Sequence, residues 1–439
     1  MKTRGIWRRA RLALLGLSAS IVASAVLDAA LAPERLVLAY HYPWYGYKPP
    51  DNWDQQKNIA DHPLLGPYRS EDPALIDFQV SLARDAGLDG FIVSWGGPET
   101  KQDEILLKML EHVERPAAGD FSLCVLCEAY AGKSDLNPAK VQRELGYAVG
   151  TLGKRKGYLR AGGKPVVFIY TPQGWPAKRW RETFDAVTKE HGRTLFIAVA
   201  DDWNFDLDYL AAFDSFGPYA DKYIADDKLL RAHALIAERL RGTAGPHIAS
   251  IIGGGSHIKK LGFDIDRAQG RYIRDRFALA QKAGADWLTI TSWNEWYESM
   301  QIEPSREYGF EQIKVVREIA HEFKGRPLPI SFTGVRLVVA SAVPKEPARD
   351  GETAQVTLTV TNRSAHNLYA VTCRREGGPD ERVAYVLHPH ESRTVQLVLP
   401  GAPPTPSALT ATVQAFLPDG EIVSTQHRLG SISAAENHE

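Results

Sequence analysis

The sequence predicts an α/β protein, a (β/α)8 TIM barrel followed by a C-terminal immunoglobulin-like β-sandwich. Eight short apolar runs alternate with amphipathic stretches over residues 36–292, and parallel strands buried on both faces have this continuous apolar character. After residue 327 the hydrophobic period changes to two, which is typical of half-buried antiparallel strands. The length of 439 residues allows two or three domains.

The apolar runs have the length of strands, and helical patterns separate them. The first run continues into 41–46, His-Tyr-Pro-Trp-Tyr-Gly, which lacks the glycine-rich loop expected in the rival fold, an open doubly wound sheet. Asp72-Pro73 is typical of a helix N-cap with proline in the first turn, and Gly87 marks the end of that helix. The predicted strands are 36–40, 90–95, 123–127, 165–170, 195–200, 213–216, 247–252 and 287–292.

The C-terminal part carries strand patterns. Val356, Leu358 and Val360 alternate with threonines, and seven such segments fit between residues 330 and 428. An immunoglobulin-like sandwich has about seven strands in about 100 residues. We expect the barrel over 33–326, the sandwich over 330–433 and a disordered tail over 434–439.

Residues 1–32 are predicted to direct export. Five basic residues and no acid occupy residues 1–11, and the apolar stretch 12–27 follows. Two interpretations stay open, a cleaved signal peptide and an N-terminal membrane anchor, although the stretch is short for a bilayer span. Either way, we expect the working domains in the periplasm or outside the cell, soluble or tethered to a membrane.

Composition excludes several classes of protein. The 52 Lys and Arg residues balance 53 Asp and Glu residues, so the chain lacks the basic excess of a nucleic-acid binder. Three cysteines cannot form a disulfide framework. Cys124 and Cys127 are interpreted as buried thiols, because residues i and i+3 of a strand point to opposite faces. We expect a monomer with no metal site and no cofactor.

Aromatic and acidic residues stand where the predicted strands end. The βα loops at those ends carry the chemistry of barrel enzymes. Aromatic rings can stack on sugar rings, while carboxylates and phenols can bind sugar hydroxyls, so an oligosaccharide or polysaccharide is the predicted ligand. The predicted substrate-binding residues are Tyr42, Trp44, Trp95, Glu128, Tyr130, Tyr170, Tyr219, Trp293 and Trp296.

Glu295 and Glu298 are the predicted catalytic pair. Glycosidic cleavage needs one carboxylic acid to protonate the leaving oxygen and one carboxylate to assist its departure. Three residues apart in a turn or helical start, two glutamates have Cβ atoms about 5–6 Å apart and can face one cleft. The flanking Trp293 and Trp296 are expected to dehydrate the pair and raise the pKa of one carboxyl.

The same segment resembles glycoside hydrolase family 99, the endo-α-mannosidase and endo-α-mannanase family, or its family 99-like relatives. Residues 293–304, Trp-Asn-Glu-Trp-Tyr-Glu-Ser-Met-Gln-Ile-Glu-Pro, resemble the signature WNEWHEGTQIEP. Residues 42–46 resemble the YxWYG opening, and residues 65–73 resemble the LGxYxSxDP segment. The Ser94-Trp95 and Glu128-x-Tyr130 positions also match, and the resemblance covers residues 36–325 but not the sandwich.

The resemblance implies retaining cleavage inside α-mannoside chains, through a 1,2-anhydro sugar. By position, Glu295 deprotonates the sugar 2-hydroxyl and Glu298 is the acid and base. Tyr42, Glu128 and Trp95 hold the sugar, Tyr219 lies near it, and Glu303 supports the site from behind. At the positions of Tyr297, Ser299 and Met300 the family has His, Gly and Thr, so we expect the preferred sugar or linkage to differ.

Three alternatives to this prediction stay open. One is a two-carboxylate glycosidase of the large barrel clan, although there the Asn-Glu pair ends the fourth strand and here it follows the eighth. A second is a non-catalytic glycan-binding protein. The third is a protein that trims a polysaccharide during its biosynthesis or export.

Overall fold

The computed structural model describes residues 34–47, 53, 59–128, 130–131, 133–200, 207–220, 224–256, 264–329, 332–342, 354–399 and 409–429. Contacts group Leu36–Glu439 into one unit. The predicted export segment and the predicted disordered tail lie outside the described residues. Within the described part of the chain, no helix is both long and apolar enough to span a bilayer.

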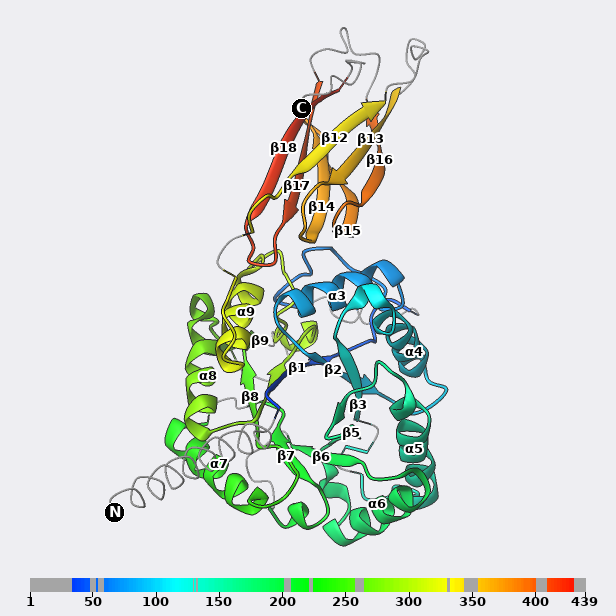
Figure 1. The fold of residues 1–439 in the computed structure, drawn as a ribbon, viewed down its shortest axis with the longest axis vertical. Helices are drawn as coiled ribbons and strands as arrows, with labels where there is room; N and C mark the ends of the chain where they lie inside the picture. Colours follow the sequence, from blue (N-terminus) through cyan, green and yellow to red (C-terminus); the bar gives the residue numbers. More distant parts are fainter. Residues whose placement is uncertain are drawn as a thin grey trace, which may run out of the picture. The chain divides into compact units, whose positions relative to one another are not determined.

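Eight parallel strands form the barrel (Figure 1). The hydrogen-bonded order is β7-β6-β5-β3-β2-β1-β11-β8, so neighbours in sequence are neighbours in space. The structure confirms the predicted barrel strands within a few residues. The largest difference is the sixth, predicted at 213–216 and found two residues later. The strands are β1 (Leu36–His41), β2 (Gly90–Trp95), β3 (Ser122–Cys127), β5 (Lys164–Tyr170), β6 (Leu195–Ala200), β7 (Ser215–Pro218), β8 (Ile248–Ile252) and β11 (Trp287–Thr291).

The barrel is nearly closed. Strands β7 and β8 are the two ends of the hydrogen-bonded order, and side chains join them. The Ser215 hydroxyl donates to the Pro246 carbonyl over 2.5 Å, and the Ser250 hydroxyl donates to the Tyr219 carbonyl over 2.7 Å. Gly217 allows the two strands to approach, because a Cβ there would lie 3.1 Å from Ile248 Cγ2.

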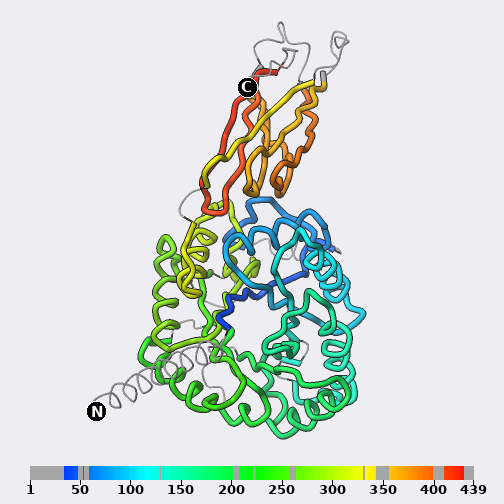
Figure 2. Tube along the Cα trace, in the orientation of Figure 1, coloured from blue at the N-terminus to red at the C-terminus, as the bar shows by residue number. Residues whose placement is uncertain are grey.

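Helices surround the barrel as the alternating pattern predicts (Figure 2). The first helix shows how the sequence sets its limits. At its start, Asp72 accepts from the Ala74 amide and Pro73 stands in the first turn. Just past its end, Gly87 has a positive φ of 83°. The α-helices of the described residues are α3 (Pro73–Asp85), α4 (Lys101–Val113), α5 (Pro138–Gly150), α6 (Ala177–His191), α7 (Asp226–Leu240), α8 (Arg271–Ala283) and α9 (Glu311–Phe323).

Short elements complete the described part of the barrel domain. They are the 3-10 helices η1 (Pro116–Ala118), η2 (Leu152–Lys154), η3 (Pro172–Gly174), η4 (Leu207–Ala211), η5 (Ala268–Gly270) and η6 (Trp296–Glu298), and the short strands β4 (Arg160–Ala161), β9 (Gly255–Ser256) and β10 (Asp264–Ile265).

Two antiparallel sheets follow the barrel, one of three strands and one of four. The seven predicted strands are found, and buried side chains from both sheets share one core. The immunoglobulin-like topology stays a prediction. The sheets are β12-β13-β16 and β15-β14-β17-β18, with strands β12 (Leu337–Ala342), β13 (Ala354–Asn362), β14 (Leu368–Arg375), β15 (Asp380–Leu387), β16 (Ser392–Leu399), β17 (Leu409–Phe416) and β18 (Ile422–Leu429).

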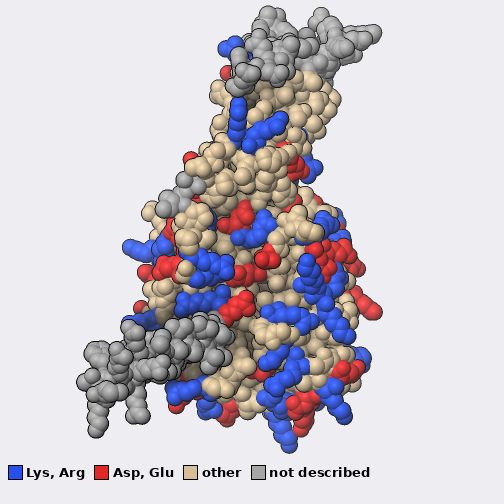
Figure 3. Space-filling view, in the orientation of Figure 1, with Lys and Arg blue, Asp and Glu red and all other residues tan. Residues whose placement is uncertain are grey.

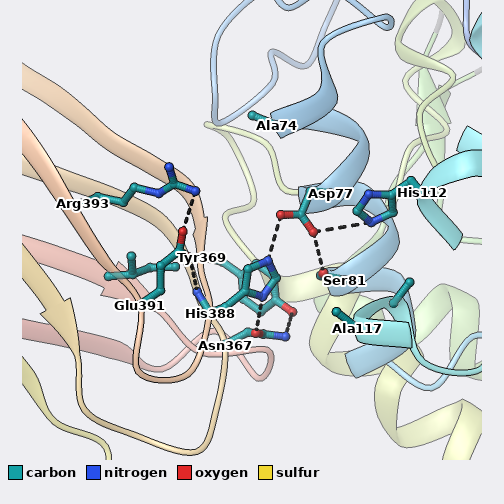
Figure 4. Close-up of polar contacts among 12 residues, drawn as sticks. Ala74, Asp77, Ser81, His112, Ala117, Asn367, Tyr369, His388, Glu391 and Arg393 are labelled. Atoms are coloured by element: carbon teal, nitrogen blue, oxygen red, sulfur yellow. Dashed lines mark hydrogen bonds and ion pairs between the residues drawn. The ribbon is translucent and has the colours of Figure 1, made fainter. Parts of the chain in front are cut away.

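Polar contacts join the four-stranded sheet to α3 (Figure 4). The Tyr369 hydroxyl donates to Asp85 over 2.6 Å, and the Asn367 amide nitrogen donates to the same carboxylate over 2.9 Å. His388 lies between Asp77, at 2.8 Å from Nε2, and the Asn367 amide oxygen, at 2.9 Å from Nδ1. Both ring nitrogens therefore face acceptors, and only the doubly protonated, charged imidazole satisfies both.

Charge is mixed over the barrel surface. Figure 3 shows basic and acidic side chains interspersed on the face that it draws. This agrees with the balance of 52 basic against 53 acidic residues. The face drawn has no large basic area of the kind that holds nucleic-acid phosphates.

Candidate active site

The segment that follows β11 is held by backbone contacts at the mouth of the barrel. The Trp293 amide donates to the Tyr40 carbonyl over 2.7 Å, and the Ser292 hydroxyl accepts from the Glu295 amide over 2.7 Å. Glu295 then caps η6, because its carboxylate accepts from the Tyr297 amide over 3.2 Å. These bonds fix the backbone on which the two predicted catalytic glutamates stand.

Glu295 and Glu298 share Tyr219 as a neighbour. Burial raises the pKa of Tyr219 well above its usual range, and the negative charges of both glutamates raise it further. Glu295 is 6% exposed, and Glu298 is half-buried. Both predicted carboxylates are therefore close enough to one phenol to act on it electrostatically, and the shared cleft stays a prediction.

Tyr219 is itself held between strands and paired with Tyr42. Its carbonyl accepts from the hydroxyls of Ser250 and Thr291, which fixes it beside the end of β11. Its hydroxyl hydrogen-bonds the hydroxyl of Tyr42. Asn294 holds Tyr42 in turn, because Asn294 Oδ1 accepts from the Tyr42 amide over 2.8 Å and Asn294 Nδ2 donates to the Tyr42 carbonyl over 3.0 Å.

Glu128 brings a third carboxyl to this group. Burial raises its pKa to about 7, although the Ser94 hydroxyl donates to it and acts in the opposite direction. The charges of Glu128 and Glu295 both raise the pKa of Tyr42, after burial and Tyr219. Tyr42 therefore lies within electrostatic reach of both carboxyls, and the charges of three acids act on this pair of phenols.

Trp44 and Tyr170 add partly exposed aromatic surface. Trp44 stacks on Tyr42 with ring centroids 4.5 Å apart, and Tyr170 meets Tyr219 edge-on at 5.5 Å. Both are half-buried, so each ring has accessible surface beside the phenol pair. The sequence analysis names both residues, and their contact with a sugar stays a prediction.

The structure places the other four predicted sugar-binding aromatics among buried partners, away from the accessible surface. Trp95 donates to Asp103 of α4 over 2.9 Å, and Tyr130 donates to Glu144 of α5 over 2.8 Å. Trp95, Tyr130, Trp293 and Trp296 are at most 2% exposed. Tyr42 is equally buried at 2%, so burial does not separate packing from ligand contact here, and the contact of these four rings with a sugar stays a prediction.

Glu303 lies behind the mouth in a buried hydrogen-bond network. It accepts from the Tyr68 hydroxyl over 2.8 Å, from Gln79 Nε2 over 2.8 Å and from Trp296 Nε1 over 3.2 Å. Burial raises the pKa of Glu303 to about 7, although these hydrogen bonds act to lower it. Tyr68 also accepts from Asn294 over 3.3 Å, which connects the network to the residue before Glu295.

A buried ion pair is the part of the site that the sequence does not indicate. Arg267 Nη2 lies 3.1 Å from Asp61 and donates to the Ser299 carbonyl over 2.7 Å. Gln301 donates to Asp61 over 2.7 Å. Arg267 and Asp61 are 206 positions apart in the chain, so no local spacing could have predicted the pair.

This arrangement defines a class of protein, a parallel βα barrel with acids and phenols gathered where its strands end. Comparison with known proteins makes the class more specific. The chain is 26% identical over 300 residues to the zebrafish (Danio rerio) glycoprotein endo-alpha-1,2-mannosidase-like protein, covering 61% of this chain and 63% of that protein. It is 24% identical over 294 residues to the human (Homo sapiens) protein of the same name, covering 60% of each. The match therefore spans about three fifths of these relatives.

Solved structures share the fold. A GH99 endo-alpha-mannosidase from Bacteroides thetaiotaomicron matches with a TM-score of 0.57 and 22% identity, over 66% of this chain and 97% of that one. A glycoside hydrolase-like protein matches with a TM-score of 0.52 and 16% identity, over 65% of this chain and 94% of that one. No protein-family model matches the chain. The comparisons confirm the resemblance to glycoside hydrolase family 99 or a family 99-like protein.

Proposed function

We propose that this protein is a glycoside hydrolase that cleaves internal α-mannosidic, or related α-glycosidic, linkages with retention. One observation carries the proposal: Glu295 and Glu298, matched by position to the family's catalytic pair, stand at the two ends of the hydrogen-bonded turn η6 after β11, with Tyr219 within electrostatic reach of both. Glycosidic cleavage needs two carboxyl groups around one reacting sugar. The relatives named endo-alpha-1,2-mannosidase-like support an α-mannoside as the substrate.

In the first step of the proposed reaction, Glu295 takes the proton of the sugar 2-hydroxyl. The freed oxygen attacks the anomeric carbon and forms a 1,2-anhydro sugar, while the bond from that carbon to the leaving oxygen breaks. Glu298 gives its proton to the leaving oxygen. The anomeric carbon is inverted once.

In the second step, Glu298 is a carboxylate and takes a proton from water. The water oxygen attacks the anomeric carbon, the three-membered ring opens, and Glu295 returns its proton to the 2-oxygen. A second inversion gives retention. Protons and charges balance, because each glutamate ends the cycle in the protonation state in which it began.

Tyr42, Glu128 and Tyr219 are the proposed contacts to the sugar before cleavage. Tyr42 and Tyr219 lie within electrostatic reach of Glu295, and the oxygens of all three residues can bind a hydroxyl. Trp44 and Tyr170 supply the accessible ring surface on this side. We assign the larger part of sugar recognition to these five residues.

The departures from the family signature lie beside the proposed acid. Tyr297 is 36% exposed, whereas the two tryptophans of the same segment are fully buried. An exposed phenol in place of an imidazole presents a larger apolar face to a bound sugar. We therefore propose that the sugar or linkage on the leaving-group side differs from that of the mannosidases.

Export of the working domains is also proposed, on the sequence alone. The basic residues of 1–11 and the apolar stretch after them are typical of an export signal. A substrate outside the cytoplasm, such as a surface polysaccharide, agrees with this location.

Release of reducing ends from α-mannan by the full-length protein tests the proposed function. We expect Glu298→Gln and Glu295→Gln to lower the rate by about 10²–10⁴-fold, the range for loss of general acid or base catalysis. Glu238→Gln, an exposed change on α7, is the control and should keep full activity. Binding of α-mannan without release by any form would instead indicate a glycan-binding protein. Full activity in both active-site variants would show that the catalytic assignment is wrong.

A further inference from the structure

The loop that joins β1 to α3 holds the signature segment from outside the barrel. We call residues 61–70 the 61–70 loop. Asp61 pairs with Arg267 and accepts from Gln301. The Leu64 amide donates to the Pro304 carbonyl over 2.9 Å, and the Tyr68 hydroxyl donates to Glu303 over 2.8 Å. Asp61, Leu64 and Tyr68 thus bind residues of 299–304, directly or, for Asp61, also through Arg267, which donates to the Ser299 carbonyl.

Strand β15 of the C-terminal sheets contacts the outer side of this loop. Arg382 Nη2 donates to the Leu65 carbonyl. Its other terminal nitrogen donates to the Tyr385 hydroxyl over 2.7 Å, and its guanidinium lies 4.4 Å from the centre of the Tyr385 ring. Tyr385 orients the guanidinium, which directs one N–H toward the backbone of the loop.

Tyr385 lies close to the buried network behind the mouth. Burial raises the pKa of Tyr385, the charge of Arg382 acts in the opposite direction, and the charges of Asp72 and Glu303 add to the rise. Its ring is 6.4 Å from that of Phe78 in α3. Tyr385 therefore lies within electrostatic reach of the carboxyl that accepts from Tyr68.

We propose that Arg382 is a positioning residue of the active site, acting through the 61–70 loop, so that the C-terminal sheets form part of the working enzyme. The proposal rests on the proposed function for its kinetic consequence and on the contacts above for its structural one. The structural match to the mannosidase covers 66% of this chain and 97% of that one. A contact from β15 to the loop is therefore an addition that this chain makes to the shared barrel.

The path from Arg382 to the reacting groups consists of direct contacts. Arg382 holds Leu65, and Tyr68 follows in the same loop. Tyr68 accepts from Asn294 over 3.3 Å, and Asn294 binds the backbone of Tyr42 through both ends of its amide. A looser loop would displace Tyr68, then Asn294, and with it Tyr42 and the glutamate that follows Asn294. Small displacements of this kind lower catalytic rates more than they weaken binding.

Docking of the sheets does not depend on Arg382. Tyr369 and Asn367 bind Asp85, and His388 binds Asp77, at separate points on α3. Replacement of Arg382 therefore removes the contact to the loop and leaves these bonds in place. The Arg382→Ala variant therefore tests the position of the 61–70 loop without detaching the sheets from α3.

The test compares Arg382→Ala with Arg374→Ala in the full-length protein. Arg374 is an exposed arginine of β14 in the same sheet, paired at 3.7 Å with Asp380. Hydrogen exchange is measured at the amides of residues 61–70, among which Leu64 and Ser70 donate to backbone carbonyls. We expect about tenfold faster exchange in Arg382→Ala, about the effect of losing one charge-assisted hydrogen bond, and no change in Arg374→Ala.

Kinetics on α-mannan give the second measurement. We expect Arg382→Ala to lower kcat about threefold to tenfold with KM nearly unchanged, and Arg382→Lys to restore part of kcat, because a lysine can still donate to the Leu65 carbonyl. Unchanged exchange in residues 61–70 would overturn the proposal. Faster exchange with wild-type kcat would overturn its catalytic part. If the wild-type protein has no hydrolase activity, the proposed function fails, and exchange alone decides whether Arg382 holds the loop.

Discussion

Replacement of Glu303 by glutamine should change how the stability of this protein depends on pH. Glu303 is 4% exposed, and burial raises its pKa from 4.5 to about 7. Between these two values the carboxyl is protonated in the folded protein and ionised in the unfolded chain. The folded state then binds more protons, so the free energy of unfolding falls as pH rises from 4.5 to about 7.

The size of the effect follows from the shift. A shift of one unit corresponds to about 1.36 kcal/mol, so the shift of Glu303 corresponds to about 3 kcal/mol of stability lost across this range. Glutamine has nearly the same shape and does not ionise. Glu303→Gln should therefore gain about 3 kcal/mol over the wild-type protein between pH 4.5 and pH 8.

Urea unfolding at several pH values, followed by tryptophan fluorescence, measures the difference. Glu128 has a similarly raised pKa, whereas burial lowers the pKa of His41 to about 4 and that of His233 to about 3. These groups change the pH dependence of the free energy of unfolding equally in the wild type and in Glu303→Gln. Their contributions therefore largely cancel when the two proteins are compared. Glu238→Gln is the exposed control and should follow the wild-type curve. A difference between Glu303→Gln and wild type that stays constant from pH 4.5 to 8 would refute the reasoning.

Two further predictions concern the sheet contact and the signature segment. The hydrogen bond that His388 donates to the Asp77 carboxylate raises the pKa of His388 above 6.5, so stability present below pH 6.5 should be lost as pH rises through that raised value. The loss should be under about 1 kcal/mol because His388 is partly exposed, and unfolding curves of His388→Gln should lack it; an equal slope in the variant would contradict the charged pair. Ser299 has a φ of 49°, and its buried hydroxyl has no hydrogen-bond partner among the described residues. Ser299→Gly should raise the free energy of unfolding by about 1 kcal/mol, and a lower melting temperature would count against the strain.

The barrel could be predicted because its strands are continuous apolar runs, a pattern typical of parallel strands buried on both faces and of few other folds. Strand β7 shows where this signal ends. Phe213 lies in the predicted run but packs on Phe184 of α6 at a centroid distance of 5.0 Å, and the strand begins two residues later. An apolar residue that covers a helix and one that enters a sheet have the same hydropathy. Only tertiary packing separates them.

The carboxyl pair could be predicted from chemistry, because few other functions place two glutamates and several phenols where strands end. The direction of the tryptophans could be predicted less well. Ser94 binds Glu128, while the next residue, Trp95, binds Asp103 on the helix side. Successive side chains of a strand point to opposite faces, so the alternation contained this information, and residue type alone did not. Arg267 and Asp61 meet only through folding, since 206 positions separate them.

The burial of the signature tryptophans has a consequence for selectivity. On the proposed contacts, a ligand at the mouth meets the rings of Trp44 and Tyr170 and the oxygens of Tyr42, Tyr219 and Glu128 instead. Stacking tolerates any flat sugar face, whereas fixed polar atoms require each substituent in one orientation. A site that leaves such atoms unpaired rejects a ligand lacking one group by several orders of magnitude. On the proposed function, epimers and deoxy analogues should therefore be distinguished far more sharply than chains that differ only in length.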